Sequence, residues 1–533
     1  MTPNRRRFLG QLSLGAAGAG LVSFTPRAFA APDPGQLPLP RSTPEAAGVA
    51  SGGVLAFLDG IARGKHELHS FMLARHGRVV SEGWWAPYAP AFNHTMYSMS
   101  KSFTSTAVGL AVAEGRLTVE DRVVKFFPKE LPDKVSDHLA AMRVRDLLSM
   151  ATGNEKEPTQ AVVKSENWVR TFLAQPIAHA PGSVFMYNSA ATYMCSAIVQ
   201  QVTGQRMLDY LRPRLFDPLG LIWVTWEQCP LGRDTGGWGL SVPTEALAKF
   251  GQLYLQKGKW NGRQLLSEKW VAEATSFKIQ QPPRGNAKSR PKEQDDWQQG
   301  YGYQFWRCRH NAFRGDGAFG QFTIVLPEQD AVIAMTAETS NMQGVLDLVW
   351  EHLLPAFEAK PLPADKERQE KLKQTLASLA LAMPEGKATS PTAERVARKT
   401  VRFDANELGL ESAHFTLNPG TWAVEFRGGP KRHIVAGSWG RWNSRGETTL
   451  PGTPPRLISG GAPKPGTAHK YSGCAAWTGE NTLELMLRYY ETPHHDSLTF
   501  KFNGDQVQLS FLSSLAKMRG AKDSRPLLQG RVG

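Results

Sequence analysis

The chain has 533 residues, of which 62 are Lys or Arg and 48 are Asp or Glu, so its formal net charge is +14 at pH 7. This length exceeds what one hydrophobic core usually supports, and we therefore expect at least two domains. The four cysteines are too few for a disulfide scaffold and their spacing matches no metal site, while the basic charge favours anionic partners.

The first thirty residues have the three parts of an export signal. Arg5-Arg6-Arg7-Phe8-Leu9 forms a basic head, residues 10–26 are uncharged, and Ala28-Phe29-Ala30 is a small-x-small cleavage site. The paired arginines are typical of twin-arginine signals. We predict that residues 1–30 are removed and that the mature protein is periplasmic or secreted, with no transmembrane span. The alternative, an uncleaved anchor, is disfavoured by the short, glycine-containing apolar run.

The charge of the mature chain also bears on its partners. Removing residues 1–30 takes away four arginines and no acidic residue, which lowers the formal charge from +14 to +10. A basic surface favours anionic cell-envelope surfaces as partners. Nucleic acid is not expected as a partner, because the chain lacks a recognisable binding motif and carries an export signal.

Residues 31–358 are predicted to form one α+β domain. A helix from Ser98 to Glu114 is apolar nearly all round, which is typical of a buried helix. Strands near both ends of the domain predict an antiparallel sheet completed by both ends and flanked by helices, with a helical lobe between. The other expected elements are a hairpin over 69–85, helices at 190–202, 244–256 and 268–275, a strand at 301–308, and a hairpin of 322–326 and 331–337.

The remainder of the chain is predicted to be a linker and a second domain. Residues 359–392 form the linker, with a charged helix over 363–382, and residues 280–297 are an expected exposed loop. Residues 393–533 are predicted to form an appended β-rich domain, with strands at 421–426, 433–439, 482–490 and 497–511.

The pattern Ser-x-x-Lys occurs three times, at Ser98, Ser289 and Ser514. The second occurrence contains a proline and lies in the basic loop, and the third lies in the appended domain. Only Ser98 begins a long buried helix. Lys101 lies three residues after Ser98, on the same face of this helix. Burial in such a helix would lower the pKa of Lys101, so that it could act as a base. The N-terminus of the helix would also offer free N–H groups to a developing oxyanion. The alternative is a capping serine beside a lysine that reaches for solvent.

Two further motifs supply groups that could act with Ser98. Tyr187-Asn188-Ser189 precedes a predicted helix, so that Tyr187 could relay a proton and Ser189 could hydrogen-bond the lysine or the substrate. Gly315-Asp316-Gly317-Ala318 precedes a strand, where the glycines would let a substrate lie against the backbone. The N–H of Ala318 could join that of Ser98 in an oxyanion hole. An ordinary core tyrosine and a glycine-rich hairpin are the alternatives.

Ser98-x-x-Lys101, Tyr187-x-Ser189 and a glycine-rich strand motif, in this order, resemble the serine β-lactamase and penicillin-binding superfamily. The resemblance covers about residues 40–357 and is greatest to the class C-like branch, with its esterases, D-amino-acid peptidases and 6-aminohexanoate-dimer hydrolases. It implies that Ser98 is the acylated nucleophile, that Lys101 and Tyr187 are base and proton relay, and that no cofactor or metal is needed.

Two departures from the family pattern bear on the substrate. Ser189 stands where β-lactamases of this class usually carry Asn, and Gly315-Asp316-Gly317 replaces Lys-Thr-Gly, whose lysine binds a substrate carboxylate. Asp316 should repel such a carboxylate. We therefore expect hydrolysis of an ester or amide of a small neutral or cationic substrate. The alternatives are β-lactamase or D-alanyl carboxypeptidase-type activity, or a non-catalytic sensor with the penicillin-binding fold.

Three other features of the sequence could form sites. His494-His495-Asp496 suggests a metal, but adjacent histidines in a strand should point to opposite faces, so none is expected. The aromatic residues Trp422, Phe426, Trp439 and Trp442 could line a polysaccharide surface, although core packing is favoured. Cys229 and Cys308 could pair in an oxidising compartment, although four free buried thiols are favoured.

Overall fold

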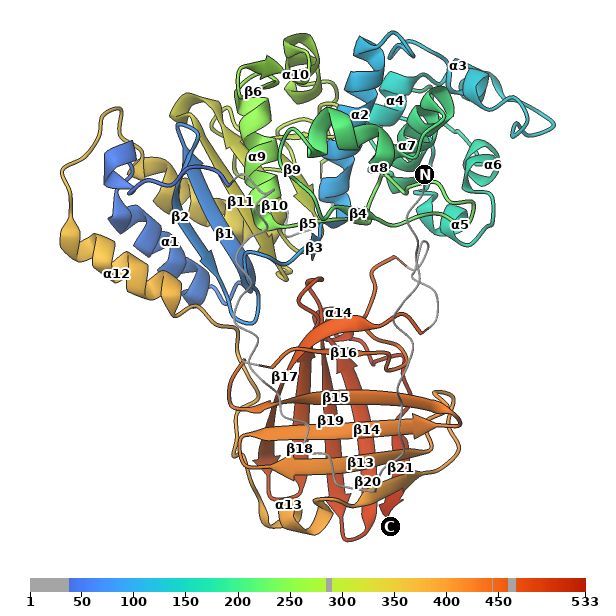
Figure 1. Ribbon diagram of the computed structural model, residues 1–533. Helices are drawn as coiled ribbons and strands as arrows, with labels where there is room; N and C mark the ends of the chain where they lie inside the picture. Colours follow the sequence, from blue (N-terminus) through green and yellow to red (C-terminus); the bar gives the residue numbers. More distant parts are fainter. Residues whose placement is uncertain (1–37, 284–289, 443, 459–465) are drawn as a thin grey trace, which may run out of the picture.

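The computed structural model describes residues 38–283, 290–442, 444–458 and 466–533, so the predicted signal peptide and the Ser289 motif lie outside the described residues. Figure 1 shows an N-terminal domain of sheet and helices and a C-terminal β-barrel. Among the described residues, no helix is both long and apolar enough to cross a membrane.

A six-stranded antiparallel sheet organises the N-terminal domain. Strand β1, near the start of the domain, pairs with β11, near its end, with Leu73 opposite Ile333. This pairing confirms that both ends of the domain complete one sheet. In spatial order the strands are β2 (Arg78–Trp84), β1 (Leu68–Arg75), β11 (Ala331–Ala337), β10 (Gln321–Leu326), β9 (Phe313–Gly317) and β8 (Trp306–Arg307).

The strand expected over 301–308 is wrong in its length. Only Trp306–Arg307 form a strand, and Tyr301 makes isolated bridges. Gln304 has a φ of +67°, and its backbone N–H donates to the carbonyl of Leu148, so the chain turns away from the sheet at this point. The strand propensity of the aromatic residues in this segment is outweighed by the hydrogen bond to Leu148 of the helical lobe.

Helices cover both faces of the sheet. On one face α1 (Ser51–Arg63) packs with α11 (Met342–Leu348) and the π-helical turn η7 (Val349–Leu353), and α9 (Thr244–Leu255) packs against β1, β10 and β11 on the other. Phe71 and Met72 of β1 belong to the two different cores, as the alternation of a strand requires.

The helical lobe is built around two long, nearly fully buried helices, α2 (Ser100–Ala113) and α7 (Ser189–Thr203), which pack against each other. This confirms the predicted α+β class with its helical lobe. The shorter helices are α3 (Asp137–Ala141), α4 (Val144–Leu148), α5 (Thr159–Val163), α6 (Trp168–Leu173), α8 (Met207–Leu211) and α10 (Glu268–Thr275).

The C-terminal domain is a closed nine-stranded barrel. Its sheet closes where β15 pairs in parallel with β17, through Ser438 and Cys474. Barrel closure removes the free sheet edges that an open β-domain would expose. The strands, in spatial order, are β15 (Lys431–Trp439), β14 (Thr421–Gly428), β13 (Ser412–Asn418), β12 (Thr400–Phe403), β21 (Leu528–Val532), β20 (Gln506–Ser513), β19 (His495–Asn503), β18 (Thr482–Arg488) and β17 (His469–Gly479).

Several expectations for the C-terminal half are refined. The single strand predicted over 497–511 is two strands, β19 and β20, joined by a turn at Asn503–Gln506. Trp422 and Phe426 pack in the barrel core, as favoured, whereas the indole N–H of Trp442 donates to the Leu381 carbonyl at 2.9 Å. All four cysteines are free and buried, which confirms the favoured alternative to a Cys229–Cys308 bridge.

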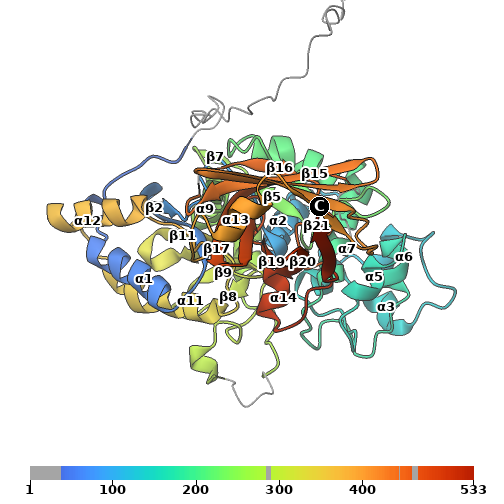
Figure 2. The same ribbon diagram turned by 90° about the horizontal axis from the view of Figure 1, so that it is seen from below.

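The barrel does not stand apart from the N-terminal domain. The connecting helix α12 (Lys366–Ala377) packs on α1 and β2 and buries Leu372. Figure 1 shows the barrel lying against the N-terminal domain where the sheet meets the helical lobe, close to β3 and β5, and Figure 2 shows the molecule from the barrel side. The segment between β18 and β19 provides many of the contacts described below.

Candidate active site

Ser98 lies where the chain turns from a short strand into α2. The strand β3 (His94–Thr95) pairs with β5 (Leu240–Val242), and the 3-10 turn η2 (Tyr97–Met99) comes directly before α2. Tyr97 has a φ of +46°, a left-handed conformation that is uncommon for a bulky residue. Ser98 is half-buried, so its hydroxyl is presented at the N-terminal end of a helix whose first N–H groups have no helical partners.

The Nζ atom of Lys101 has three oxygen neighbours. Ser98 Oγ lies at 3.1 Å, Ser189 Oγ at 3.0 Å and the Gly237 carbonyl oxygen at 2.7 Å. A carbonyl only accepts, so Gly237 takes an N–H in either charge state of the amine. When the amine is neutral and its second N–H goes to Ser189, its lone pair faces the Ser98 hydroxyl. Lys101 can therefore take the Ser98 proton without moving.

Burial makes Lys101 able to act as a base near neutral pH. Its side chain is almost fully buried between α2 and α7, and this desolvation lowers the pKa of Lys101 to about 7. The carboxylates of Glu157 and Asp316 oppose that shift by favouring the charged amine. A large share of the amine is therefore neutral at pH 7 and above.

Tyr187 lies over the same amine. The Lys101 Nζ atom is 5.0 Å from the centroid of its ring, and the ring stacks on that of Trp306 with centroids 5.8 Å apart. Burial raises the pKa of Tyr187 well above its usual value, the Asp316 carboxylate acts in the same direction, and a hydrogen bond with Ser98 opposes the shift. The phenol is therefore protonated at neutral pH and suits a proton relay better than a phenolate base.

The glycines of β9 bring that strand close to η2, the turn that carries Ser98, which we call the nucleophile turn. A Cβ on Gly315 would lie 2.5 Å from Met99 Sδ, and one on Gly317 would lie 2.1 Å from the Met96 carbonyl oxygen. The interpretation of these glycines as space for substrate needs correction, because their open face packs against the protein itself. Ala318 follows directly, so its N–H is carried on the segment that runs beside η2.

Asp316 lies on the opposite face of β9 and is paired with a buried arginine. Arg314 Nε lies 2.9 Å from Asp316 Oδ2, and the guanidinium also donates to the Asp296 carbonyl and to Cys308 Sγ. The Arg314 side chain is fully buried and stacks over the Trp297 ring, 4.3 Å from its centroid. Burial raises the pKa of Asp316, and Arg314 opposes the shift. Nothing in the sequence around Arg314 predicts that its guanidinium binds the Asp316 carboxylate.

Comparison with known proteins assigns the family. Residues 60–353, more than half of the chain, match the family model described as Beta-lactamase. The chain belongs to the beta-lactamase family. As a member of this family with the β-lactamase-like α+β fold, it is a β-lactamase-fold hydrolase.

Individual relatives of this family member are distant. The 6-aminohexanoate-dimer hydrolase of Paenarthrobacter ureafaciens is 28% identical over 288 residues, which cover 50% of this chain and 71% of that protein. Protein flp of Staphylococcus aureus strain MW2 is 25% identical over 196 residues, covering 34% of this chain and only 39% of that protein. The octameric penicillin-binding protein homologue from Pyrococcus abyssi aligns with a TM-score of 0.45 at 15% identity, over 89% of this chain and 99% of that one.

A lysine at position 315, where the resemblance to Lys-Thr-Gly would place one, would require neighbouring side chains to move. A side chain at position 315 would meet Met99 Sδ and, at 2.6 Å, the Ser102 hydroxyl. The nearby cation Arg314 does not replace the missing lysine, because it is fully buried and held by Asp316 and its other partners. Neither Gly315 nor Arg314 therefore offers a free cation to a substrate carboxylate.

The structure adds two groups to the site that sequence reasoning missed. Glu157 is exposed, accepts from the Ser189 N–H at 3.2 Å, and places a carboxylate near Lys101. Gly237 accepts from Lys101, and a Cβ there would lie 2.7 Å from the Ser189 carbonyl. Gly237 lies in the run Gly236-Gly237-Trp238-Gly239. Nothing in its local pattern shows that its carbonyl faces a lysine 136 residues earlier.

The histidine pair and the remaining Ser-x-x-Lys motif lie at the contact with the barrel. His494 and His495 both contact the Glu338 carboxylate, so the expectation that they point to opposite faces is wrong, because His494 precedes β19. Ser514 donates to the same carboxylate, while Lys517 is exposed, so this motif lacks a buried base.

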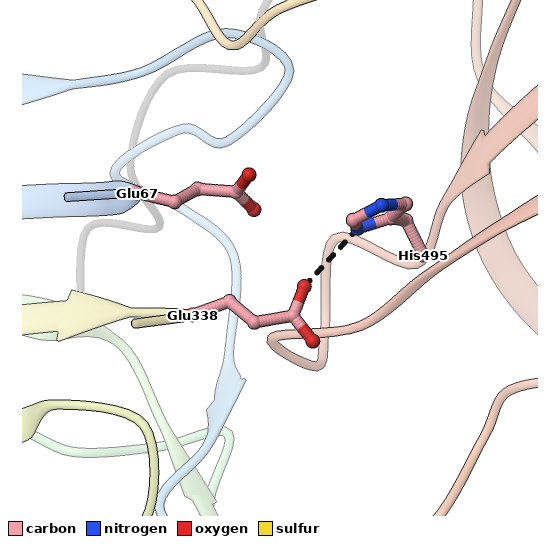
Figure 3. Close-up of side chains that lie close together, drawn as sticks. All are labelled: Glu67, Glu338 and His495. Atoms are coloured by element: carbon pink, nitrogen blue, oxygen red, sulfur yellow. Dashed lines mark hydrogen bonds and ion pairs between the residues drawn. The ribbon is translucent and has the colours of Figure 1, made fainter. Parts of the chain in front are cut away.

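Glu67, Glu338 and His495 bring three possible metal ligands within 4.8 Å of one another, as Figure 3 shows. Arg488 already occupies this cluster, with Nη1 and Nη2 at 2.5 and 3.1 Å from the two Glu67 oxygens. A divalent cation here would be repelled by the buried guanidinium. The cluster therefore fits an ion-pair contact between the domains better than a metal centre.

Proposed function

We propose that the protein is an exported serine hydrolase that cleaves an ester or amide bond of a small neutral or cationic substrate through an acyl-enzyme at Ser98. The proposal rests on the position of the Lys101 amine. Its Nζ atom lies 3.1 Å from Ser98 Oγ and makes its two other hydrogen bonds to the Ser189 hydroxyl and the Gly237 carbonyl. A hydroxyl becomes a useful nucleophile when such a base takes its proton.

The reaction proceeds in two acyl transfers. Lys101 takes the Ser98 proton as Ser98 Oγ bonds to the carbonyl carbon, and the N–H groups of Ser98 and Ala318 stabilise the oxyanion. Tyr187 passes the proton to the leaving alcohol or amine as its bond to the carbonyl carbon breaks. Water then attacks the acyl carbon and gives up a proton to Lys101. The bond from that carbon to Ser98 Oγ breaks, and Lys101 returns the proton to Ser98 as the acid leaves.

The charges around the amine favour a neutral or cationic substrate. The position of the family's carboxylate-binding lysine is Gly315, and Arg314 is bound to Asp316. Glu157 adds an exposed carboxylate near Lys101. Asp316 is paired with Arg314, so Glu157 leaves the site with a net negative charge when the amine of Lys101 is neutral. That charge would disfavour a substrate carboxylate and attract an amine. A β-lactam or a D-alanyl peptide is the alternative substrate.

The cellular setting of the proposal rests on residues 1–30, whose basic head, apolar run and cleavage site support export to the periplasm or beyond. The basic mature chain would be attracted to an anionic cell-envelope surface. The third alternative, a non-catalytic sensor, is disfavoured because Ser98, Lys101 and Tyr187 are assembled as a reactive set.

A substrate panel tests the proposal. Short p-nitrophenyl esters, linear amides with a free amino group, and nitrocefin are compared with wild-type protein and with Ser98→Ala. We expect turnover of esters or amides by the wild type, weak turnover of nitrocefin, and loss of turnover in Ser98→Ala. Turnover by Ser98→Ala at the wild-type rate would remove Ser98 from the mechanism, and efficient nitrocefin hydrolysis would favour the β-lactamase alternative.

A further inference from the structure

The barrel reaches the nucleophile turn through the segment 489–494, between β18 and β19. The backbone N–H of Thr95 donates to the Glu491 carbonyl at 2.9 Å, the Tyr88 hydroxyl donates to the Thr492 carbonyl at 2.8 Å, and Tyr490 stacks on Phe92 at 4.3 Å. This segment therefore lies directly against the chain that leads into Ser98.

A buried chain of three polar side chains continues from this contact. The Tyr97 hydroxyl lies 2.5 Å from His494 Nε2, and His494 Nδ1 lies 2.5 Å from Glu338 Oε1. If the phenol donates to Nε2, the neutral ring carries its proton on Nδ1 and donates it to the carboxylate. The His494 side chain is fully buried. One residue of the barrel thus links the nucleophile turn to the residue that follows β11.

His494 also contacts the second half of the candidate oxyanion hole. The Phe319 ring lies 5.3 Å from the His494 ring and 5.6 Å from the Tyr97 ring, edge-on to both. Tyr97 directly precedes Ser98, and Phe319 directly follows Ala318. Tyr97 and Phe319, which flank the two candidate N–H donors, therefore both contact His494.

Both flanking residues have backbone conformations that need support. Tyr97 has a φ of +46° and Phe319 a φ of +71°, in the left-handed region that bulky residues seldom adopt. Such conformations persist when surrounding contacts hold them, and they are concentrated at functional sites. Rotation of the peptide bond between Tyr97 and Ser98 would turn the Ser98 N–H away from an oxyanion.

We infer that His494 of the barrel is a positioning residue for acyl transfer, which holds Tyr97 and Phe319 so that the N–H groups of Ser98 and Ala318 point at one oxyanion. This inference rests on the proposed function and extends it, because it makes the C-terminal domain part of the active site. The ion pair of Arg488 and Glu67 anchors the same end of the barrel to the N-terminal domain.

The full-length chain offers a matched pair of substitutions to test this. Tyr97→Phe removes the hydroxyl that meets His494, and Tyr88→Phe removes another buried hydroxyl that meets the same barrel segment but does not border Ser98. The measurements are the rate of labelling by a fluorophosphonate probe, kcat and KM on a p-nitrophenyl ester, and the melting temperature. His494→Gln and the double variant with Tyr97→Phe complete a double-mutant cycle.

We expect Tyr97→Phe and His494→Gln each to lower kcat and the labelling rate by about 10-fold to 100-fold with little change in KM, because oxyanion contacts act in the transition state. Tyr88→Phe should stay within about twofold of the wild type, and the double variant should lose no more than the worse single variant. Wild-type labelling rates in both single variants, an equal loss in Tyr88→Phe, or additive losses would overturn the inference. Failure of the wild type itself to be labelled would instead contradict the proposed function.

Discussion

At the scale of single residues, the protonation state of the Lys101 amine decides whether Ser98 can be activated. Lys101 is buried and bound on three sides by Ser98, Ser189 and Gly237, and these contacts remain satisfied whether the amine is charged or neutral. The amine can thus lose and regain a proton during each turnover without repacking its surroundings. The Ser-x-x-Lys spacing predicted the proximity of Ser98 and Lys101, but it could not predict that Gly237 supplies the third partner.

The pH dependence of turnover follows from the pKa of Lys101. Because burial lowers that pKa to about 7, kcat/KM should rise as the pH increases through about 7 and level off above it. Lys101→Arg, whose guanidinium stays charged, should remove this rise and lower kcat/KM by about 100-fold or more. A pH profile that is flat between 5 and 9 in the wild type would contradict the role of Lys101 as the base.

The same burial has a consequence for stability. The folded-state pKa of Lys101 lies below its usual value of 10.5, so the cost of burying the charged amine is full below about pH 7 and disappears as the pH rises toward 10.5. Lys101→Met should therefore stabilise the fold by roughly 2–4 kcal/mol at pH 6 and by much less at pH 10. Urea unfolding at the two pH values measures this, and an equal effect at both would show that charge burial is not the cause.

At the scale of elements, the site depends on how closely β9 approaches the turn before α2. The buried helix at 98–114 and the two hairpins could be predicted from apolar periodicity, because they follow local patterns. The packing role of Gly315 and Gly317 could not, because it depends on where Met96 and Met99 lie in space. The strand expected over 301–308 failed for the same reason, since Gln304 is held by the distant Leu148 carbonyl.

A pair of glycine substitutions measures this close approach. In Gly317→Ala the new Cβ would lie 2.1 Å from the Met96 carbonyl oxygen, so either β9 or the nucleophile turn must shift. We expect a loss of about 2 kcal/mol or more in unfolding free energy and a large loss of turnover. Gly52→Ala, in α1, meets only Arg368 at 3.7 Å and should be neutral or slightly stabilising. Equal stability of the two variants would contradict the packing role of Gly317.

At the scale of the whole molecule, the barrel and the N-terminal domain share a buried, charged contact. The composition and strand pattern predicted a β-rich C-terminal domain, but not its closure by β15 and β17 or its contact with the residue before Ser98. The closure joins Ser438 to Cys474, and the contact between the domains joins Tyr97 to His494, 397 positions later in the chain. Sequence periodicity carries no information about such pairs.

The contact between the domains can be tested with matched ion pairs. Arg488 is buried and binds Glu67, whereas Arg427 is exposed and binds Glu425 on the barrel surface. Arg488→Met should cost about 2–4 kcal/mol, because it leaves the half-buried Glu67 carboxylate without its cation, and Arg427→Met should cost about 0–1 kcal/mol. Urea unfolding and limited proteolysis between the domains measure the difference. Similar effects of the two substitutions would contradict a buried anchoring role for Arg488.

The central claim is that Ser98 is the nucleophile of a hydrolase, and covalent labelling tests it most directly. Wild-type protein and Ser98→Ala are incubated with a fluorophosphonate probe, and the intact masses and labelled peptides are compared. The account predicts one adduct per chain, on Ser98, and none in the variant. An unlabelled wild type, or an adduct that persists in Ser98→Ala, would contradict it.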